Sequence, residues 1–532
     1  MHSREERQKL AGWVRFLLPS AADLIFLALL LLLSLSGLSS RVLGDGDIGW
    51  HIRNGEQMLA THAIPRVDVF SSSMHNQPWY AWEWLYDLAI AGIHGWMGLN
   101  GVVVFTAAVI ALSLTLTFRM ALHRGATLPV DLAMVMLTIG ASAIHWLARP
   151  HVLSWLLTVV WFCLLDSWEK SIGGARDRSL LWLPVLMVFW VNIHGGFLMG
   201  FALLGIYLAC EVLHCFVWER KPGAGKRLKW LGGVTGLSLA ASLVNPYGYK
   251  LHEHVYEYLS NHWLMNHIDE FKSPNFHGVA EQCFLGLLVI VVVTIAFAPE
   301  RPRLAEAGVI LFAVCSGLYA SRSLPASAIL LMLVGAPMLS EAMAAADKSA
   351  LLAPGLRRWL VRFDSYGART RETELRLRGH VWPALAFVLV LSIAASGGEV
   401  GSHQVMDAHF DSQKFPVQAV DLIAAIHVNE PIFCPDNWGG YLIYRLYPQT
   451  RVVVDDRHDL YGSDFFKEYL KIIRADPSWN DLLQAKGVRV VLAPAQSGLA
   501  TALDESSDWR PTYQDEVAVV FERSQTNRYG IQ

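Results

Sequence analysis

Two aspartates directly follow the first long apolar run of the chain, in the sequence Gly44-Asp45-Gly46-Asp47. A segment that faces lipid gains nothing from two carboxylates one residue apart, so both are candidates for chemistry. A carboxylate can remove or orient the proton of a hydroxyl group. Paired carboxylates could also hold a divalent cation such as Mg²⁺ or Mn²⁺. Glu83 is a third acid in the same polar segment.

Further polar residues stand near the ends of other apolar runs: His51, Arg149, His151, His194, Glu270 and Arg322. The arginines and histidines among them have cationic and imidazole side chains, which suit a phosphate group. A sugar carried on a polyprenyl phosphate has a leaving group that needs cationic stabilisation rather than a general acid. One carboxylate base and a cationic clamp would suffice for its transfer, whereas a glycosidase normally uses two paired carboxylates.

Several of these groups also have a purely structural interpretation. A single arginine at a helix end, such as Arg322, often extends toward lipid headgroups. His194-Gly195-Gly196 and Pro246-Tyr247-Gly248 are common ways to end a helix. The tryptophans of the first polar segment fit an aromatic belt at the membrane surface as well as a sugar platform. Only the acidic pair lacks such an explanation.

The composition is that of a membrane protein. Hydrophobic residues make up 53% of the 532 residues, charged residues only 17%, and the mean hydropathy is +0.34. Soluble domains have about 25% charged residues. The first apolar run, of about twenty residues, favours a retained helix over a cleaved signal peptide. We predict a polytopic α-helical membrane protein with about eleven transmembrane helices, near residues 21–41, 98–118, 127–147, 150–167, 179–196, 198–217, 228–245, 283–299, 304–321, 323–341 and 380–397.

Charge orients these helices, because lysine and arginine concentrate in alternate loops. The richest of these loops is the basic stretch from Lys348 to Arg378. The positive-inside rule places that set of loops in the cytoplasm of a bacterial inner membrane. With an odd number of helices, the N-terminus is cytoplasmic and the C-terminal part is periplasmic. All candidate residues then fall on the periplasmic side.

The outer side has three substantial parts in this topology. The first outer loop covers about 42–97 and the second about 245–282, both within a transmembrane module of residues 1–397. The tail, 398–532, alternates short β-rich runs at 431–434, 451–454, 488–492 and 517–521 with a helical stretch at 463–474. It is predicted to be a soluble α/β domain.

The motifs of these outer parts resemble those of the bacterial GT-C superfamily of integral membrane glycosyltransferases. The resemblance is distant, to protein mannosyltransferases and to aminoarabinose lipid A transferases, and it spans most of the chain. It rests on Asp45-x-Asp47-x-x-Trp50-His51-x-x-x-Gly55, Pro65-Arg-Val-Asp68-Val-Phe-Ser71, Pro78-Trp79, Glu83-Trp84-Leu85, Arg149-Pro150, Asn192-x-His194-Gly195-Gly196, Asn245-Pro246-Tyr247-Gly248, Glu270-Phe-x-Ser273-Pro274, Trp438-Gly439-Gly440-Tyr441-Leu442 and Asp455-Asp456-Arg457.

The resemblance implies a GT-C-like fold and inverting transfer of a hexosyl or pentosyl group from a polyprenyl-phosphate donor. Asp47 would be the catalytic carboxylate, with Asp45 and Glu83 as acidic support. His51, Arg149, His151, His194, Glu270 and Arg322 would bind the donor phosphate or substrate. Any metal would lie on Asp45 and Asp47. The named relatives have adjacent Asp-Glu in the first outer loop, whereas Glu83 lies far downstream here.

The acceptor class therefore stays open among a glycan, a lipid and a protein. Membrane lipid is an expected partner, and nucleic acid is not. Two other functions remain as alternatives. A transporter or flippase of lipid-linked glycans would favour ionisable residues near mid-membrane, broken helices and repeated halves. A non-catalytic envelope scaffold would leave the acids of the first loop unexplained.

Overall fold

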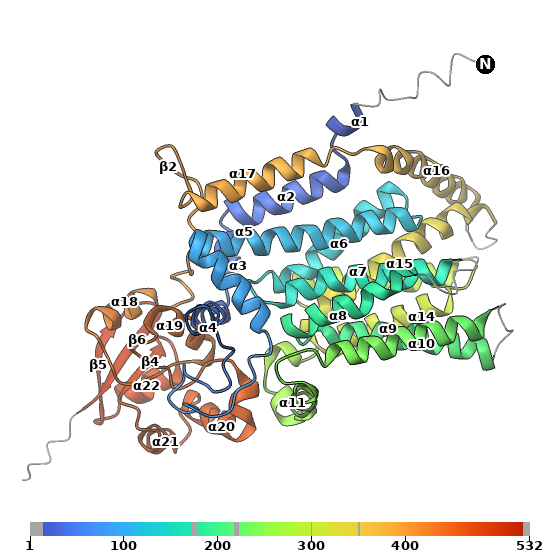
Figure 1. Cartoon of the computed structure of the whole chain (residues 1–532). Helices are drawn as coiled ribbons and strands as arrows, with labels where there is room; N and C mark the ends of the chain where they lie inside the picture. Colours follow the sequence, from blue (N-terminus) through green and yellow to red (C-terminus); the bar gives the residue numbers. More distant parts are fainter. Residues whose placement is uncertain (1–13, 172–177, 218–222, 299, 349–351, 525–532) are drawn as a thin grey trace, which may run out of the picture.

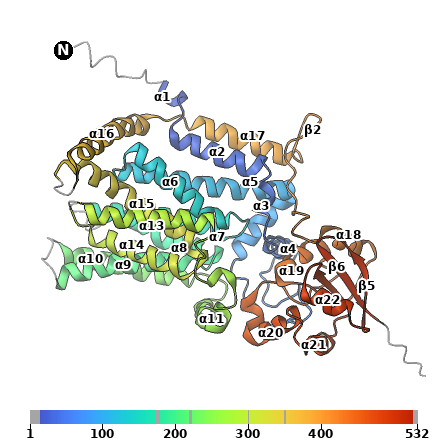
Figure 2. The same ribbon diagram turned by 180° about the vertical axis from the view of Figure 1, so that it is seen from behind.

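The computed structural model describes residues 14–171, 178–217, 223–298, 300–348 and 352–524. Long helices lie side by side in a bundle, and an α/β domain covers one end of it (Figure 1). The view from behind shows the same two parts, with the short helix α4 between them (Figure 2). One cluster of buried apolar side chains extends from the bundle into the α/β domain, and a second lies within that domain and against α12 (His262–Met265).

The bundle contains a helix at each of the eleven predicted apolar runs. The long helices are α2 (Ala21–Leu35), α5 (Trp84–Arg124), α6 (Leu128–Ser142), α7 (His151–Lys170), α8 (Trp182–Ile193), α9 (Phe197–Phe216), α10 (Ala224–Ser242), α13 (Val279–Phe297), α14 (Leu304–Tyr319), α15 (Leu324–Ala344) and α17 (Val381–Ala395). Short helices α1 (Val14–Leu17), α3 (Ser39–Val42), η2 (Ala143–His145), η3 (Arg178–Leu181) and η6 (Ala346–Lys348) join them.

Seven helices of the described chain are long and apolar enough to cross a membrane, or eight if the bent pair α16 (Pro354–Arg376) and α17 counts as one span. Apolar helices α8 and α14 are shorter than a full span. The chain is thus a multi-pass membrane protein with a mostly helical fold, as predicted. The number of eleven crossings stays a prediction.

Helices also occupy the two outer loops, where the sequence pattern indicated none. The first loop contains α4 (Asp47–Thr61), which ends because His62 adopts a left-handed conformation (φ 53°) and bonds back to the Met58 carbonyl. The second contains α11 (Tyr249–Ser260), α12 (His262–Met265) and η4 (Asp269–Phe271). Both α4 and α11 are seen end-on in Figure 1, across the end of the bundle that faces the α/β domain.

The tail forms a four-stranded sheet of order β3-β4-β6-β5, in which β3 and β4 are parallel and the other neighbours antiparallel. Three of the predicted β-rich runs form strands, whereas the fourth, near Val452, makes only isolated bridges. The elements of the tail are β1 (Glu399–Val400), β2 (His403–Gln404), α18 (Val417–Ala425), β3 (Ile432–Phe433), α19 (Asp436–Leu446), α20 (His458–Ile473), α21 (Trp479–Ala485), β4 (Val490–Pro494), α22 (Gly498–Asp504), β5 (Trp509–Gln514) and β6 (Ala518–Arg523).

The tail is seated on the bundle through a close approach of α19 and α4. A Cβ at Gly440 would collide with the carbonyl oxygen of Gly46, and one at Gly49 with the carbonyl oxygen of Gly440. Glycine is required at such positions because any side chain would push the two backbones apart. The motif around Gly440 therefore serves to hold the tail against the loop that carries Asp45 and Asp47.

Candidate active site

The acids of the first loop meet an arginine from a different part of the bundle. Asp45 lies in the turn before α4, Asp47 is its first residue, and the Asp47 backbone N–H donates to Asp45 Oδ1 at 3.0 Å. Arg149, just before α7, donates through Nη1 to Asp45 Oδ2 at 2.9 Å and pairs through Nη2 with Asp47. Glu270 of η4 accepts from the same Nη1 at 2.8 Å. Arg149 thus binds three carboxylates.

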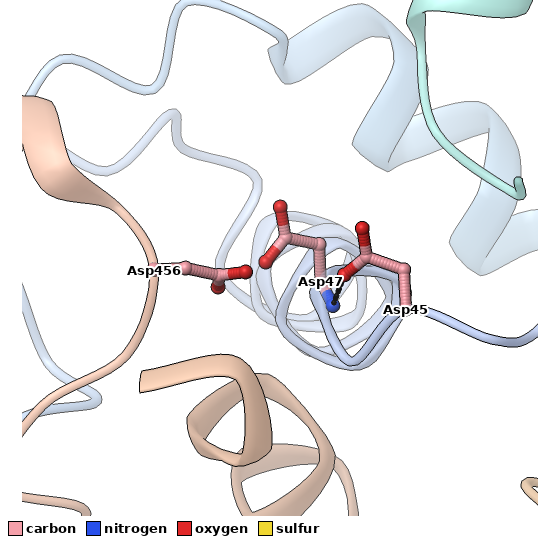
Figure 3. Close-up of side chains that lie close together, drawn as sticks. All are labelled: Asp45, Asp47 and Asp456. Atoms are coloured by element: carbon pink, nitrogen blue, oxygen red, sulfur yellow. Dashed lines mark hydrogen bonds between the residues drawn. The ribbon is translucent and has the colours of Figure 1, made fainter. Parts of the chain in front are cut away.

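A third aspartate of this cluster comes from the tail. The carboxyl groups of Asp456 and Asp47 point toward one another, with Asp45 beside them (Figure 3). One carboxylate oxygen from each of the three residues lies within 4.8 Å of the others. The sequence motif around Asp456 was noticed, but no role was assigned to it. Only the fold brings it to Asp47.

The three aspartates differ in how they hold protons. Burial and the charge of Asp47 raise the pKa of Asp45 to about 6, although Arg149 opposes them. Burial alone would raise the pKa of Asp47, but Arg149 and a hydrogen bond from Asp456 outweigh it and lower that pKa. Burial and the charges of Asp47 and Asp45 raise the pKa of Asp456 well above its ordinary value. A proton between these two neighbouring carboxyl groups is therefore favoured on Asp456 rather than on Asp47.

This donor set fits a divalent cation. Hard cations such as Mg²⁺ and Mn²⁺ prefer carboxylate oxygens. Oδ1 of Asp47 and Oδ1 of Asp456 are both buried without a hydrogen-bond partner. A cation would take the place of the proton between them, so Asp45, Asp47 and Asp456 are the residues that could hold it.

A second polar group surrounds Glu83, which lies directly before α5. Its two carboxyl oxygens stand 3.9 Å from Nε2 of His51 and 3.8 Å from Nε2 of His194. His51 Nδ1 is 2.5 Å from Oδ1 of Asp87, whose other oxygen accepts from Asn54 at 2.6 Å. Burial raises the pKa of Glu83 to about 8 against the opposing charge of His51. Glu83 is thus protonated at neutral pH.

The pKa values of the two histidines beside Glu83 shift in opposite directions. Burial alone would lower the pKa of His51, but the Asp87 carboxylate outweighs it and raises that pKa. Burial and the nearby Arg322 lower the pKa of His194 well below its ordinary value. His194 Nδ1 accepts the Gly196 backbone N–H at 3.0 Å, so its proton sits on Nε2. His194 is a neutral donor directed toward Glu83.

His151 and Arg322 lie near Glu270 and His194. His151 Nε2 donates to the carbonyl oxygen of His145 at 2.9 Å, which leaves its Nδ1 as an acceptor. The Arg322 guanidinium, in η5 (Ser321–Ser323), stacks over the Phe271 ring with 4.5 Å from Cζ to the centroid. Within the described part of the chain, no carboxylate lies within ion-pair distance of Arg322. Its charge is available for a ligand.

These groups share one cavity of about 460 Å³ between the bundle, the outer loops and the tail. Asp47, Glu83, Arg149, His151, His194, Glu270 and Arg322 line it, and Asp45 and His51 contact its lining residues from behind. Its other end is apolar and lies among the long helices, where Trp155, Leu198, Met199, Ala202 and Phe312 line it. All nine residues predicted from the sequence therefore belong to one site.

Buried polar contacts hold the loops of this cavity in place. Arg457 bonds Asp455 at 2.7 Å and Asp68 at 2.8 Å, so it ties the tail segment that carries Asp456 to the first outer loop. Its guanidinium also lies 4.6 Å from the centroid of the Trp79 ring. All three charged side chains are almost fully buried, so loss of one partner would leave an uncompensated charge.

The sequence motifs that end α8 and α10 also hold the loops of the cavity in place. Trp84 Nε1 donates to Asn192 Oδ1 at 2.7 Å, and Asn192 in turn donates to the Val244 carbonyl at 2.8 Å. The Tyr247 hydroxyl accepts the Ala81 N–H at 2.8 Å. These bonds fix the segment before Glu83 against α8 and the end of α10. Their side chains position the site rather than line it.

Sequence reasoning assigned no role to the tail residues of the cavity. Asp456, Arg457, His458 and Asp459 all line it. Asp459 accepts from His254 of α11 at 3.0 Å, which links the tail to the second outer loop. Asp87, which orients His51, was also assigned no role from the sequence. The signal that could have found these residues was the dense charge of the sequence Asp455–Asp459, unusual among buried residues.

Comparison with solved structures identifies the fold. The apo oligosaccharyltransferase of Archaeoglobus fulgidus matches 98% of this chain and 75% of its own, with a TM-score of 0.54 and 10% identity. The same archaeal enzyme, AglB, in complex with an inhibitory peptide and a dolichol-phosphate gives a TM-score of 0.56 at 10% identity over the same shares. The predicted GT-C-like fold is confirmed.

A more remote likeness is to ArnT from Cupriavidus metallidurans in the apo state, with 15% identity, a TM-score of 0.44 and coverage of 96% of this chain and 97% of that one. No protein-family model and no curated protein matches the chain.

Proposed function

We propose that this protein is a membrane glycosyltransferase that transfers a sugar from a polyprenyl-phosphate donor to an acceptor hydroxyl or amide at the end of the bundle covered by the tail. One observation carries the proposal: a single cavity joins Asp47, whose pKa is lowered, an arginine with no ion-pair partner among the described residues and an apolar wall between helices. A base, a phosphate-binding cation and a lipid-binding surface are the three features that such a transfer needs.

The donor lipid would bind with its chain against the apolar wall of α7, α9 and α14 and its phosphate at Arg322. The arginine can present two parallel N–H groups to a phosphate. His194 can add a neutral N–H donor from Nε2. The dolichol-phosphate in the archaeal oligosaccharyltransferase structure supports a lipid phosphate of this kind as the ligand class.

The transfer itself breaks the bond between the anomeric carbon and the phosphate oxygen and forms one to the acceptor. Asp47 would take the acceptor proton, and the departing phosphate would keep the electron pair of the broken bond. The negative charge that develops on the phosphate falls near Arg322, where a preorganised cation stabilises it. We propose an inverting reaction, in which the acceptor activated by Asp47 attacks the face of the sugar away from the phosphate.

A divalent cation on Asp45, Asp47 and Asp456 is part of the proposal. When bound, it would stabilise the charge that develops on oxygen during transfer. Arg149 and Glu270 would hold the aspartates in place around it. Because Asp456 belongs to the tail, the tail would complete the site rather than merely cover it.

The decisive experiment compares purified wild type with Asp47→Asn and Asp456→Asn, using a panel of polyprenyl-phosphate sugars and detection of the transferred sugar. Asn keeps the size of Asp but removes its basicity, so Asp47→Asn should lower the rate by about 10²- to 10⁴-fold. Manganese binding, followed by electron paramagnetic resonance, should weaken in both variants. Lys467→Gln, on the exposed face of α20, is the control.

A wild-type rate of sugar transfer in Asp47→Asn would show that Asp47 is not the catalytic base. Absence of product from folded wild type with every donor of the panel would overturn the transferase and favour the transporter or flippase, which forms no glycosidic bond. Unchanged manganese binding in both variants would overturn the cation site alone, while leaving the transfer reaction testable by product formation.

A further inference from the structure

A stripe of arginines runs along the exposed face of α16, far from the cavity. Arg358, Arg362, Arg369 and Arg376 are all exposed, and their spacing of four, seven and seven residues places them within about 40° of one another around the helix. Arg376 stands 3.8 Å from Glu372, and the others make no ion pair within the described chain. The stripe therefore carries an excess of unpaired positive charge.

Aromatic side chains border this arginine stripe. Trp359 and Tyr366 are 56% and 57% exposed. A helix that faces water gains nothing from exposing large aromatic side chains. The opposite face of α16 is packed on the bundle: Gly367 fits against Thr127 and Pro129. A helix with one packed face, exposed aromatic residues and arginines has the pattern of a helix in the headgroup layer of a membrane.

The position of α16 agrees with this pattern. The helix lies at the end of the bundle away from the α/β domain, and it bends by 60° from the apolar helix α17 (Figure 1). Its Glu374 accepts the backbone N–H groups of Ala21 and Ala22 at 2.9 and 3.2 Å, so α16 also meets the beginning of α2. At this end of the bundle the spans must leave the hydrocarbon and meet headgroups.

An apolar cavity of about 380 Å³ lies beneath the first turns of α16. Residues of α13, α15 and α16 line it, including Val293, Phe297, Met343 and Leu360. Phe297 is 49% exposed, so the cavity reaches the lipid-facing surface of the bundle. Lys348 also lines it and has no ion-pair partner in the part of the chain that the structure describes.

We infer that α16 and this cavity bind an anionic phospholipid of the leaflet opposite the candidate active site. One acyl chain enters the cavity between α13 and α15. The lipid phosphate lies near Lys348, and further anionic headgroups lie along the arginine stripe. An acidic protein segment would satisfy the arginines, but it would leave unexplained an apolar cavity that continues the lipid-facing surface.

The test uses the full-length protein in mild detergent with phosphatidylglycerol or phosphatidylcholine of identical acyl chains. Native mass spectrometry counts the retained lipids, and thermal unfolding reports their effect. Wild type should retain phosphatidylglycerol preferentially and unfold at a higher temperature with it. The preference should shrink when salt is raised from about 0.1 M to about 1 M, since the screening length falls from roughly 10 to 3 Å.

Two variants separate the arginine stripe from the cavity. Changing Arg358, Arg362, Arg369 and Arg376 together to Gln should reduce the preference by roughly fivefold for each arginine removed. Ala342→Phe, which fills the cavity, should remove one tightly held phosphatidylglycerol while leaving the salt-dependent binding intact. The control changes four exposed cations at the other end of the molecule to Gln: Lys250, Lys414, Lys471 and Arg510.

The control should keep the wild-type preference, and circular dichroism should show the same helix content in all proteins. Equal retention of the two lipids by wild type would overturn the inference. So would an unchanged preference after loss of the four stripe arginines. Retention unaffected by Ala342→Phe would overturn the acyl-chain site. None of these measurements depends on sugar transfer, so they stand apart from the proposed function.

Discussion

Glu83 sits between two histidines that hold their protons differently. Nε2 of His51 and Nε2 of His194 stand 3.9 and 3.8 Å from its two oxygens. The pKa of Glu83 is about 8 because burial favours its neutral form. A carboxylic acid that stays protonated can donate a hydrogen bond to a substrate oxygen while Asp47 acts as a base. Glu83 and Asp47 both carry a carboxyl group, and their different surroundings give them different roles.

The pH profile of sugar transfer should show this division. As pH rises through about 8, Glu83 loses its proton and activity should fall. As pH falls through about 6, Asp45 gains a proton, its pairing with Arg149 weakens, and activity should also fall. Glu83→Gln mimics the protonated acid, so it should keep substantial activity and lose the alkaline decline. Initial rates of both proteins from pH 5 to 9.5 measure this.

The fall of activity on the acidic side of the pH profile is the internal control. Glu83→Gln leaves Asp45 unchanged, so this fall should persist in the variant. Loss of all activity in Glu83→Gln across the whole range would show instead that Glu83 acts as a carboxylate. An alkaline decline that persists in the variant would assign this limb to another group.

Arg322 and Arg149 differ in what surrounds their guanidinium groups. Arg149 already binds three carboxylates, whereas Arg322 stacks on Phe271 and has no ion-pair partner among the described residues. Arg322→Lys should lower kcat/KM for the donor by roughly ten- to a hundredfold, because hydrogen bonds to charged groups contribute about 1.5–3 kcal/mol and lysine lacks the planar fork. Steady-state kinetics against donor concentration measure this.

Arg41→Lys is the matched control, since that arginine bonds only a backbone carbonyl and lies at the same end of the bundle. Arg149→Lys should lower the unfolding temperature as well as activity, because it disturbs the acidic cluster. If both the Arg322 and the Arg149 variants kept near wild-type donor kinetics, neither arginine would bind the donor phosphate. Both would then have only a structural role at the membrane surface.

At this scale, candidate residues are easiest to find in the sequence where polar residues interrupt apolar runs. Asp45, Glu83, Arg149 and the histidines are conspicuous because membrane segments exclude them. Asp456 could not be assigned in this way, since charged residues are ordinary in a soluble domain. Its proximity to Asp47 depends on the seating of the tail, which no local pattern encodes.

The contact between α4 and α19 is the element that seats the tail. Gly440→Ala would place a methyl group against the carbonyl of Gly46, so the two helices must separate. Such overpacking typically costs about 1–3 kcal/mol. We expect a lower unfolding temperature and a larger loss of transfer, because Asp456 would move away from Asp47. Thermal unfolding and product formation measure the two effects.

Gly498→Ala is the control, because a Cβ at that first position of α22 meets no atom within 4 Å. It should leave stability and transfer close to wild type. Wild-type stability and transfer in Gly440→Ala would show that the helices can shift freely and that the glycine is not required for seating.

The elements themselves were predictable to different degrees. Runs that are apolar around their whole circumference became helices, because a bilayer leaves the backbone no other way to satisfy its hydrogen bonds. The surface helices α4 and α11 were missed. Their sequences mix charge, aromatic rings and apolar residues, and most of the stability of such helices comes from the surfaces they pack on.

At the scale of the whole molecule, the two ends of the bundle differ in chemistry. The end near the tail carries the cavity and its acids, and the other end carries α16 and its arginines (Figure 1). The N-terminus of α2 belongs to the arginine end, since Glu374 of α16 accepts its first N–H groups. The chain therefore begins its first long helix at one end and enters the tail at the other. An odd number of crossings would give this path, and the number of eleven stays a prediction.

The last prediction follows from that geometry and from the distribution of charge. The basic end should face the cytoplasm, and the tail should face the periplasm. A reporter inserted after Gly225 should therefore report the cytoplasmic side, and one fused after Gln532 the periplasmic side. Alkaline phosphatase, active only outside, and a fluorescent protein that folds only inside give opposite signals for each fusion. A cytoplasmic signal from the C-terminal fusion would contradict this topology, because it would place the cavity and the end that is poor in lysine and arginine in the cytoplasm.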